Sequence, residues 1–472
     1  MVLMDPNTGD ILAMATYPDY NLNTPFTPNE KLSATWDSLS NEEKTNSLYE
    51  MYRNKVVAST YEPGSVFKII TASAGLEEGI VQTDTPGDFY CNGYENVYGV
   101  RIGCAKQAGH GSQSLRNALE NSCNPALIQL GSRIGATTLY KYIGAFGFFD
   151  KTGIATSGES ACIFHELSNV GPVELATTCF GQRFEITPLQ MITAACAIAN
   201  GGTLLQPRIV TKIENVDTKV TTNVEVKKVR QVISSETASK IRNMMQSVVT
   251  DGGGQSGAVA GYSIAGKTGT SEPNSNHEED GYTASFLAIA PVENAQVVAL
   301  LTLYGPQGSS HYGGTIAAPV VSQVLSEVLP YLNVPSNDSA ATRSNTITVP
   351  DLKGKTISTA KQILSDLGLS GLASASDDEI ITSQTPKAGI SLSEDGVVRL
   401  YTENNGTSIS TTVPDLKGKS LYAAKTALKN KNLNIQTSGS GIVVSQDISA
   451  ETSVEEGTVV KITLQEVTSD LH

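Results

Sequence analysis

The sequence predicts an α+β protein in which a large domain, an antiparallel sheet flanked by helices, is followed by two small α+β modules. Strand-like segments occur at both ends of residues 1–333 with helical patterns between them, so the first hairpin is expected to complete a sheet formed by the last strands. Residues 347–404 and 411–466 share short identical motifs, which indicates an internal repeat. A chain of 472 residues is long enough for this organisation.

The large domain is predicted to open with a β-hairpin. Apolar runs at Met1–Met4 and Ile11–Ala15 flank a cluster of turn-forming residues, and polar sequence then continues to Lys55. A turn rich in Pro and Gly feeds a helix predicted over Val66–Glu77. Residues 110–200 show apolar positions three and four apart, which predicts several packed helices.

The second part of the large domain is predicted to hold short β-like runs, a helix, three strands and a final helix. These elements are expected at Ile209–Ile213 and Thr221–Val226, at Ser235–Val249, at Tyr262–Thr270, Thr283–Ala290 and Gln296–Leu303, and at Thr315–Tyr331.

The repeated modules follow a polar linker, which we place at residues 334–346. The motif VPDLKGK at Val349–Lys355 recurs at Val413–Lys419. In each copy an amphipathic helix is predicted after the motif, followed by alternating strands that end in Val397–Tyr401 or Val459–Thr463.

The composition narrows the classes of partner. Lys and Arg number 33 against 47 Asp and Glu, for a formal charge of −14 that is spread along the chain. Such a surface repels phosphate backbones, so no nucleic-acid partner is expected. No apolar run approaches the length of a membrane span, and no signal-peptide pattern precedes the first strand.

The six cysteines do not fix the redox compartment. They form no CxxC pair and the five histidines have no zinc spacing, so no structural metal is expected. Cys91 and Cys104 bracket a Gly- and Tyr-rich stretch, and two interpretations remain open: a small disulfide loop or two free thiols. Cys162, Cys179 and Cys196 are predicted to be buried as small hydrophobic residues.

Ser65 and Lys68 form the first candidate for catalysis, an SxxK motif. Residues three apart share a helix face, so Lys68 is expected beside the Ser65 hydroxyl. A lysine with a lowered pKa can take the proton of a serine, and the helix N-terminus favours developing negative charge. The alternative is a capping serine with a surface lysine, and the motif alone does not separate the two.

Ser122 and Asn124 belong to a second motif, SxN. A functional interpretation makes Ser122 a proton relay toward the leaving group and Asn124 a hydrogen-bond donor to the substrate. The alternative is a polar turn between two helices, ahead of Pro125.

Residues Lys267–Thr270 form a third motif, KTGT, at the end of a predicted strand. Gly269 is expected to let an extended peptide lie close to the strand edge. Lys267 offers positive charge, and the hydroxyls of Thr268 and Thr270 suit a carboxylate. The alternative is an ordinary strand end with a solvent-exposed lysine.

The three motifs together, in the order SxxK, SxN, KTG, are the signature of serine acyl-transfer enzymes that recognise D-Ala-D-Ala and β-lactams. Residues 1–333 resemble the transpeptidase domain of class B penicillin-binding proteins, and the two repeats resemble PASTA domains. The combination looks most like clostridial enzymes of division or sporulation. The resemblance also rests on Val2–Ala15, Tyr61–Lys68, Phe180–Gln190, Ala199–Gly202 and Ala265–Ser271.

The resemblance implies a role for each motif residue and no cofactor. Ser65 would attack the D-Ala-D-Ala carbonyl with the help of Lys68, and the backbone N–H groups of Ser65 and Thr270 would form the oxyanion hole. The implied catalytic residues are Ser65, Lys68, Ser122 and Lys267, and the implied substrate-binding residues are Asn124, Thr268, Gly269 and Thr270.

The resemblance also implies a setting. Its members cross-link peptidoglycan stem peptides, use a lipid-linked precursor, are acylated by β-lactams and work with division or elongation partners that include a glycosyltransferase. They act at the extracytoplasmic face of the bacterial membrane, held by an N-terminal anchor and a pedestal domain. The present sequence begins at the first strand of the catalytic domain, so we expect a fragment or a misplaced start codon.

Two other classes of function remain open. A D,D-carboxypeptidase or a β-lactamase-type hydrolase would share the three motifs, although tandem PASTA-like repeats argue against a lactamase. A non-catalytic lactam-sensing or wall-binding protein is the second alternative, which the intact motif residues disfavour. No histidine stands in a context that suggests a Ser-His-Asp hydrolase.

Overall fold

The computed structural model describes residues 1–272, 281–336, 347–393, 396–404, 409–419, 421–439 and 442–465. The chain divides into two compact units, Met1–Gln323 and Val324–His472, and each is described by itself. The predicted linker lies mostly outside the described residues. None of the described helices combines the length and the apolar character needed to cross a membrane.

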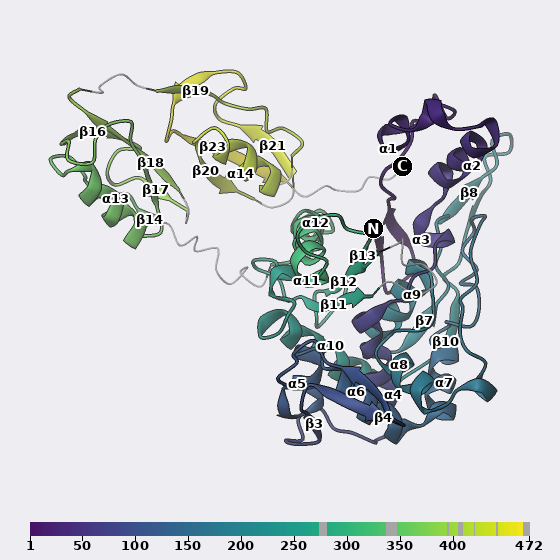
Figure 1. Ribbon diagram of the computed structural model, residues 1–472. Helices are drawn as coiled ribbons and strands as arrows, with labels where there is room; N and C mark the ends of the chain where they lie inside the picture. The colour runs from purple at the N-terminus through teal and green to yellow at the C-terminus, as the bar shows by residue number, and fades with distance from the viewer. Residues whose placement is uncertain are drawn as a thin grey trace. The chain divides into compact units, whose positions relative to one another are not determined.

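A five-stranded antiparallel sheet forms the frame of the first unit (Figure 1). Its strand order is β11-β12-β13-β1-β2, so the first hairpin completes the sheet as the sequence predicted. Val2 lies opposite Leu300 across the junction, and Val2–Met4 is fully or almost fully buried. The strands are β1 (Val2–Met4), β2 (Ile11–Met14), β11 (Ala265–Ser271), β12 (Thr283–Ala290) and β13 (Val297–Tyr304).

Helix α4 (Lys68–Glu77) runs through the centre of the helical part of the first unit. Every residue from Lys68 to Leu76 is buried, because other helices pack on all its sides. Gly75 permits close packing: a Cβ there would lie 2.8 Å from Leu130 Cδ1 of α6. The surrounding helices are α5 (Leu115–Glu120), α6 (Asn124–Ile134), α7 (Ala136–Ala145), α8 (Pro172–Cys179), α9 (Pro188–Ala199) and α10 (Ser235–Thr250).

Three predicted elements differ from the structure. The helix over Val66–Glu77 begins as a 3₁₀ turn, η2 (Gly64–Phe67), before α4. The final helix is split into α11 (Gly313–Ile316) and α12 (Ala318–Tyr331). The strand expected at 209–213 is mostly irregular, and only β8 (Lys212–Glu214) pairs with β9 (Thr221–Asn223), where all six residues are exposed and bury no apolar surface.

The polar segment before Lys55, for which the sequence predicted no element, contains helices. The longest is α2 (Asn41–Tyr52), which begins with a capping box in which Ser40 accepts from the Glu43 N–H and the Glu43 carboxylate accepts from the Ser40 N–H. The Ser-x-x-Glu spacing was a visible signal for it. The other short elements are α1 (Glu30–Ser33), η1 (Trp36–Ser38), α3 (Lys55–Ala58), η3 (Leu167–Asn169), η4 (Gln255–Gly257), β7 (Thr203–Leu205) and β10 (Lys228–Gln231).

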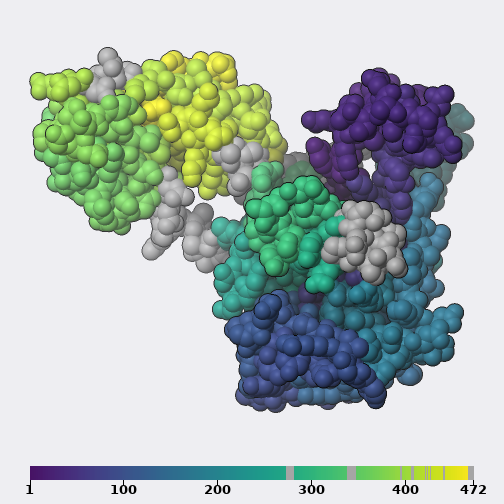
Figure 2. All heavy atoms as spheres, in the orientation of Figure 1, coloured from purple at the N-terminus to yellow at the C-terminus, as the bar shows by residue number. Residues whose placement is uncertain are grey.

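Two small hairpin pairings lie between α4 and α5. Strand β3 (Phe89–Cys91) pairs with β6 (Gly111–Gln113), and β4 (Tyr94–Val97) pairs with β5 (Val100–Gly103). Figure 2 shows this part of the chain in dark blue on the surface of the first unit. We call residues 89–113 the hairpin segment.

The second unit holds the two repeats, which have the same topology. Each has one helix and a three-stranded sheet whose central strand pairs parallel with one neighbour and antiparallel with the other. The first repeat contains β14 (Ile347–Thr348), α13 (Ile357–Asp366), β15 (Ser370–Leu372), β16 (Ile381–Thr385), β17 (Ser391–Leu392) and β18 (Val397–Thr402); the second contains β19 (Ser410–Thr412), α14 (Leu421–Lys429), β20 (Asn434–Ser438), β21 (Ile442–Gln446), β22 (Ser453–Glu455) and β23 (Val459–Gln465).

A repeated glutamine explains part of the sequence identity between the repeats. Gln384 Oε1 accepts a hydrogen bond of 2.8 Å from the backbone N–H of Leu352, and Gln446 Oε1 accepts one of 2.8 Å from Leu416. Each amide thereby fixes the turn of the VPDLKGK motif onto the sheet of its own repeat. Leu352 and Leu416 are fully buried in the two separate cores.

We expect the first unit to fold without the repeats, because its sheet and helices form their own hydrophobic core. Removing residues 337–472 should leave its denaturation midpoint unchanged. The only tryptophan of the chain, Trp36, lies in this unit and reports on it alone through its fluorescence in a urea titration. A large shift of the midpoint to lower urea would contradict this independence.

Candidate active site

The three sequence motifs meet in one cleft of the first unit. The cleft has a volume of about 1100 Å³ and is lined by Ser65, Ser122, Asn124, Thr268 and Thr270. These residues come from η2, from the junction of α5 and α6, and from strand β11. The motifs are therefore brought together by the packing of η2 against the edge strand β11 and of α4 against α6.

Two glycines hold the turn that presents Ser65. Gly64 has a φ of 55°, and a Cβ there would lie 2.7 Å from the carbonyl oxygen of Thr270. A Cβ on Gly181 would lie 1.9 Å from the carbonyl oxygen of Gly64. Only residues without side chains fit these close backbone contacts, which set Ser65 directly beside the end of β11.

Gly269 has a different structural role from the one expected. A Cβ at this position would lie 2.2 Å from Ser285 Oγ and 2.8 Å from Val66 Cγ2. The space left by its missing side chain is filled by the protein itself, and this seats η2 against β11. This packing by itself requires glycine here, and the close approach of a peptide to the strand edge stays a prediction.

Lys68 is fully buried and points to the SxN motif. Its Nζ donates to the Ser122 carbonyl at 2.6 Å, to Ser122 Oγ at 3.3 Å and to Asn124 Oδ1 at 2.7 Å. Among the described residues it makes no hydrogen bond to Ser65, and the placement of Lys68 beside the Ser65 hydroxyl stays a prediction. Its Nζ is instead bound to acceptors of the SxN motif, which lie beside α4.

Lys267 is also fully buried, which corrects the expectation that it presents charge to a substrate. Its Nζ donates to Ser122 Oγ at 3.0 Å and to the carbonyl of Thr268 at 3.2 Å. Neither Lys68 nor Lys267 lines the cleft. Both lysines reach the cleft through the hydroxyl of Ser122.

Burial lowers the pKa of both lysines. Burial lowers the pKa of Lys68 to about 8, against the opposing charges of Cys123 and Cys104. Burial and then the charge of Lys68 hold the pKa of Lys267 well below its usual value. Within the described part of the chain neither ammonium has a carboxylate partner, so the pair can readily hold a neutral amine beside Ser122.

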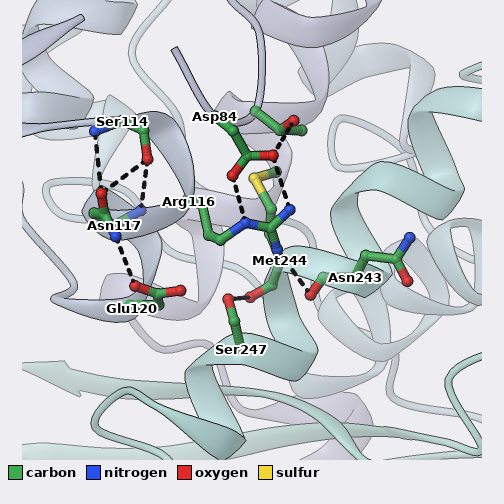
Figure 3. Close-up of polar contacts among 9 residues, drawn as sticks. Asp84, Ser114, Arg116, Asn117, Glu120, Asn243, Met244 and Ser247 are labelled. Carbon is green, nitrogen blue, oxygen red and sulfur yellow. Dashed lines mark hydrogen bonds and ion pairs between the residues drawn. The ribbon is translucent and has the colours of Figure 1, made fainter. Parts of the chain in front are cut away.

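The backbone of Ser122 lies in the left-handed region, with a φ of 50°. It directly follows α5, whose N-terminus carries a reciprocal Ser114–Asn117 capping box. Figure 3 shows how α5 is held: Arg116 Nε donates to Asp84 at 2.6 Å, and Arg116 Nη1 donates to the Asn243 carbonyl of α10 at 3.3 Å. These contacts hold the N-terminal half of α5, the helix whose C-terminal end leads into Ser122.

Asn124 and Thr270 each keep one polar group for a ligand. Asn124 Nδ2 donates to the Gly103 carbonyl at 3.1 Å, which leaves its second N–H. Thr270 Oγ1 accepts from the Gly313 N–H at 3.2 Å, so its own hydroxyl proton is available to donate toward the cleft. Both arrangements suit an anionic peptide end.

The cleft also contains residues that no motif indicated. Arg101 and Arg183 line it, and the ring of His311 stacks on that of Tyr282 with centroids 3.9 Å apart. No local pattern indicated these residues, because they come from separate segments whose proximity depends on the tertiary fold. They replace Lys267 as the exposed cations of the cleft.

A group of four residues near the SxN motif was also missed. The side chains of Cys91, Cys104, His110 and Cys123 bring one ligand-type atom each to within 4.8 Å of one another. Both Cys91 and Cys104 are free thiols, so the disulfide interpretation of this pair is not what the structure has. The prediction that no structural metal is present considered only short spacings between cysteines and histidines along the chain. The structure instead brings together residues that are distant in the sequence. We call these four residues the cysteine–histidine cluster.

Comparison with known families gives two matches. Residues 1–326 match the family described as the penicillin binding protein transpeptidase domain, and residues 347–404 and 411–466 match the PASTA domain.

Two curated relatives are similar over most of this chain. It is 37% identical over 409 residues to Stage V sporulation protein D of Bacillus subtilis, covering 85% of this chain and 60% of that protein. It is 32% identical over 346 residues to the peptidoglycan D,D-transpeptidase PbpA of Mycobacterium tuberculosis, covering 70% of this chain and 66% of that protein. The chain thus spans 60–66% of the length of these two relatives.

Solved structures share the fold of the first unit. Penicillin-binding protein 3 of Mycobacterium tuberculosis, complexed with aztreonam, aligns with a TM-score of 0.60 and 28% identity, covering 71% of this chain and 73% of that one. The D,D-transpeptidase domain of a peptidoglycan glycosyltransferase from Eggerthella lenta aligns with a TM-score of 0.58 and 28% identity, covering 69% and 76%.

The left-handed backbone of Ser122 leads to a prediction about stability. Glycine adopts this conformation without the Cβ clash that costs other residues about 1 kcal/mol. Ser122→Gly is therefore expected to unfold with a free energy about 1 kcal/mol higher than Ser122→Ala, since both lose the same hydroxyl. Urea titrations followed by Trp36 fluorescence measure the difference, and an alanine variant as stable as the glycine variant would refute it.

Proposed function

The chain belongs to the penicillin-binding protein transpeptidase family, and on that premise we propose that it is a serine D,D-transpeptidase that cross-links peptidoglycan stem peptides. The observation that carries the proposal is the pair of buried lysines on the Ser122 hydroxyl, at the floor of a cleft that also exposes Ser65. A buried amine of lowered pKa beside a serine is the arrangement needed to activate a hydroxyl nucleophile.

In the proposed first step Ser65 Oγ attacks the carbonyl of the penultimate D-Ala, and Lys68 Nζ takes the hydroxyl proton. Lys68 is bound to Ser122 and Asn124 in the free protein, so it must turn toward Ser65 once substrate is present. Negative charge develops on the carbonyl oxygen. The backbone N–H groups of Ser65 and Thr270 are proposed to stabilise it, because the contacts of Gly64 bring these two segments together.

The leaving D-Ala amine then needs a proton. We assign its delivery to Ser122, whose hydroxyl contacts both Lys68 and Lys267 at 3.3 and 3.0 Å and lines the cleft. Lys267 thus acts through Ser122. The bond between carbonyl carbon and amine nitrogen breaks, and the acyl group remains on Ser65 as an ester.

In the second step the amine of another stem peptide attacks the ester, loses a proton to the same lysine pair and releases Ser65. A β-lactam would acylate Ser65 by the same first step and leave a stable ester, because no leaving group departs. Thr268 and Thr270 are proposed to bind the carboxylate of either ligand with their hydroxyls, and Asn124 to bind its amide with its remaining N–H.

The proposal includes the setting of the reaction. We propose that the protein acts on peptidoglycan and its lipid-linked precursor, together with glycosyltransferase partners, at the outer face of the bacterial membrane. Two PASTA domains at residues 347–404 and 411–466 fit a protein that works on the wall. The similarity to Stage V sporulation protein D supports a sporulation role in particular.

Ser65 should carry the label when the protein reacts with a fluorescent penicillin. Peptide mapping of the labelled protein should find the adduct on Ser65, and Ser65→Ala should lose the label because no other hydroxyl occupies that turn. The matched control is Ser59→Ala, which lies on the same chain segment outside the cleft lining. Undiminished labelling of Ser65→Ala would exclude the proposed nucleophile.

The rate of penicillin acylation should rise with pH. Below a pH of about 8 the Lys68 amine is protonated and cannot accept the Ser65 proton, so the rate should be low there; above it the neutral form predominates and the rate should reach a plateau. Stopped-flow measurement of acylation from pH 6 to 10 tests this, with half the maximal rate expected near the pKa of Lys68. A rate that is flat or falls over this range would remove Lys68 as the base.

A further inference from the structure

The cysteine–histidine cluster has the composition of a metal site rather than of apolar packing. Three thiols and one imidazole face one another, and the three cysteines are buried with exposures of 1%, 7% and 0%. A histidine is not needed to pack three small apolar side chains. Thiolate and imidazole together are the ligands that a structural zinc ion takes in Cys₃His sites.

The distances fit a tetrahedral ion. Zn–S bonds of about 2.3 Å and a Zn–N bond of about 2.0 Å place the ligand atoms of a tetrahedron about 3.5–3.8 Å apart. Cys104 Sγ lies 3.5 Å from His110 Nδ1, and all four ligand atoms lie within 4.8 Å of one another. Small movements of side chains therefore suffice to close the coordination sphere.

Hydrogen-bond donors around the cluster favour negatively charged sulfur. The Gly93 backbone N–H donates to Cys91 Sγ at 3.4 Å. Gln113 is 3% exposed, and its Oε1 accepts from Asn121 at 2.9 Å, which fixes the orientation of the amide. Among the described residues its buried Nε2 has no hydrogen-bond partner, and it faces the Cys123 sulfur. An amide N–H buried in this way is satisfied by a metal-bound thiolate.

The backbone of the hairpin segment is built to bring these ligands together. A Cβ on Gly93 would lie 1.9 Å from the Gln107 carbonyl oxygen, and a Cβ on Gly109 would lie 2.3 Å from that of Cys91. Two glycines thus let the loops that carry Cys91 and His110 close on each other. The Cys104 N–H donates to the Gly93 carbonyl at 2.9 Å, which adds the third loop.

We propose that the cysteine–histidine cluster binds one zinc ion in a tetrahedral Cys₃His site. Its fourth ligand, Cys123, stands between Ser122 and Asn124, so the ion would tie the SxN motif to the hairpin segment. This role is structural: the ion would fix the backbone that positions Ser122 and Asn124 and would take no part in bond making. The site itself does not depend on the proposed transpeptidase activity.

Metal content tests the site directly. The full chain should retain about one zinc per molecule after dialysis, measured by elemental mass spectrometry, as expected of a closed four-ligand site. Cys91→Ser should lose this zinc, and Cys162→Ser, whose thiol lies outside the cluster, should retain it. Cobalt(II) added to the metal-free protein should give thiolate charge-transfer and intense visible bands that are lost in Cys91→Ser.

Circular dichroism checks that the variants are folded. If Cys91→Ser does not fold, His110→Gln, which replaces the least buried ligand, is tested in its place. The proposal is overturned if the full chain holds no stoichiometric zinc, if Cys91→Ser retains as much as Cys162→Ser, or if non-reduced peptides show a Cys91–Cys104 disulfide in the isolated protein.

A second measurement tests the positioning role, and this part rests on the proposed function. Cys91→Ser should react with penicillin at least about tenfold more slowly than Cys162→Ser, because misplacement of catalytic groups by an ångström has effects of this size or more. Added zinc should restore the rate of chelator-treated wild-type protein and leave Cys91→Ser slow. Equal rates with and without bound zinc would show that the ion does not position the SxN motif, while the metal content would still report on the site.

Discussion

Two buried lysines that share one serine hydroxyl are the constraint on which the catalytic unit depends. Burial of Lys68 and Lys267 without a carboxylate partner among the described residues would be costly if both were charged, and the pKa shifts relieve that cost. Ser122 must therefore lie where both Nζ atoms reach it. This requirement is met by its left-handed backbone, by the anchoring of α5 by Arg116, and by the packing of η2 against the edge strand β11.

Local sequence pattern was sufficient for much of the fold. The strand-like segment Thr283–Ala290 predicted β12 with the bounds that the structure has, and the apolar spacing after Ser235 predicted α10 to within one residue. The hairpin at Met1–Met14 was placed in the sheet correctly, because its two short apolar strands had to be covered by the later ones. Segments without an apolar face, such as α2 and the exposed pair β8–β9, gave no comparable signal.

The site was predictable as a set of residues and only partly as a geometry. Helix spacing predicted that Lys68 would lie beside Ser65, but spacing could not show that Ser122 and Asn124 supply the acceptors that its Nζ binds. A lysine at a strand end was expected to meet solvent or substrate, yet Lys267 is buried under the neighbouring helices. The cysteine–histidine cluster depends on the closure of three loops against the start of α6, and spacing along a chain does not encode such proximity.

The glutamine contacts of the two repeats bear on how such a protein can gain or lose modules. Gln384 and Gln446 each bind a backbone N–H inside their own repeat. A duplicated gene segment would therefore encode a repeat that contains its own stabilising hydrogen bond. By contrast, the side chain of Asn434 binds both the N–H and the carbonyl of Val397 in the preceding repeat. Ser370 is its counterpart in the first repeat, because the backbone N–H of each residue donates to the carbonyl of the residue before the last strand. The side chain of Ser370 is too short to make the contacts that Asn434 makes. The second repeat thus carries in its own sequence the contact that joins it to the repeat before it, and among the described residues the first repeat lacks this contact at the matching position.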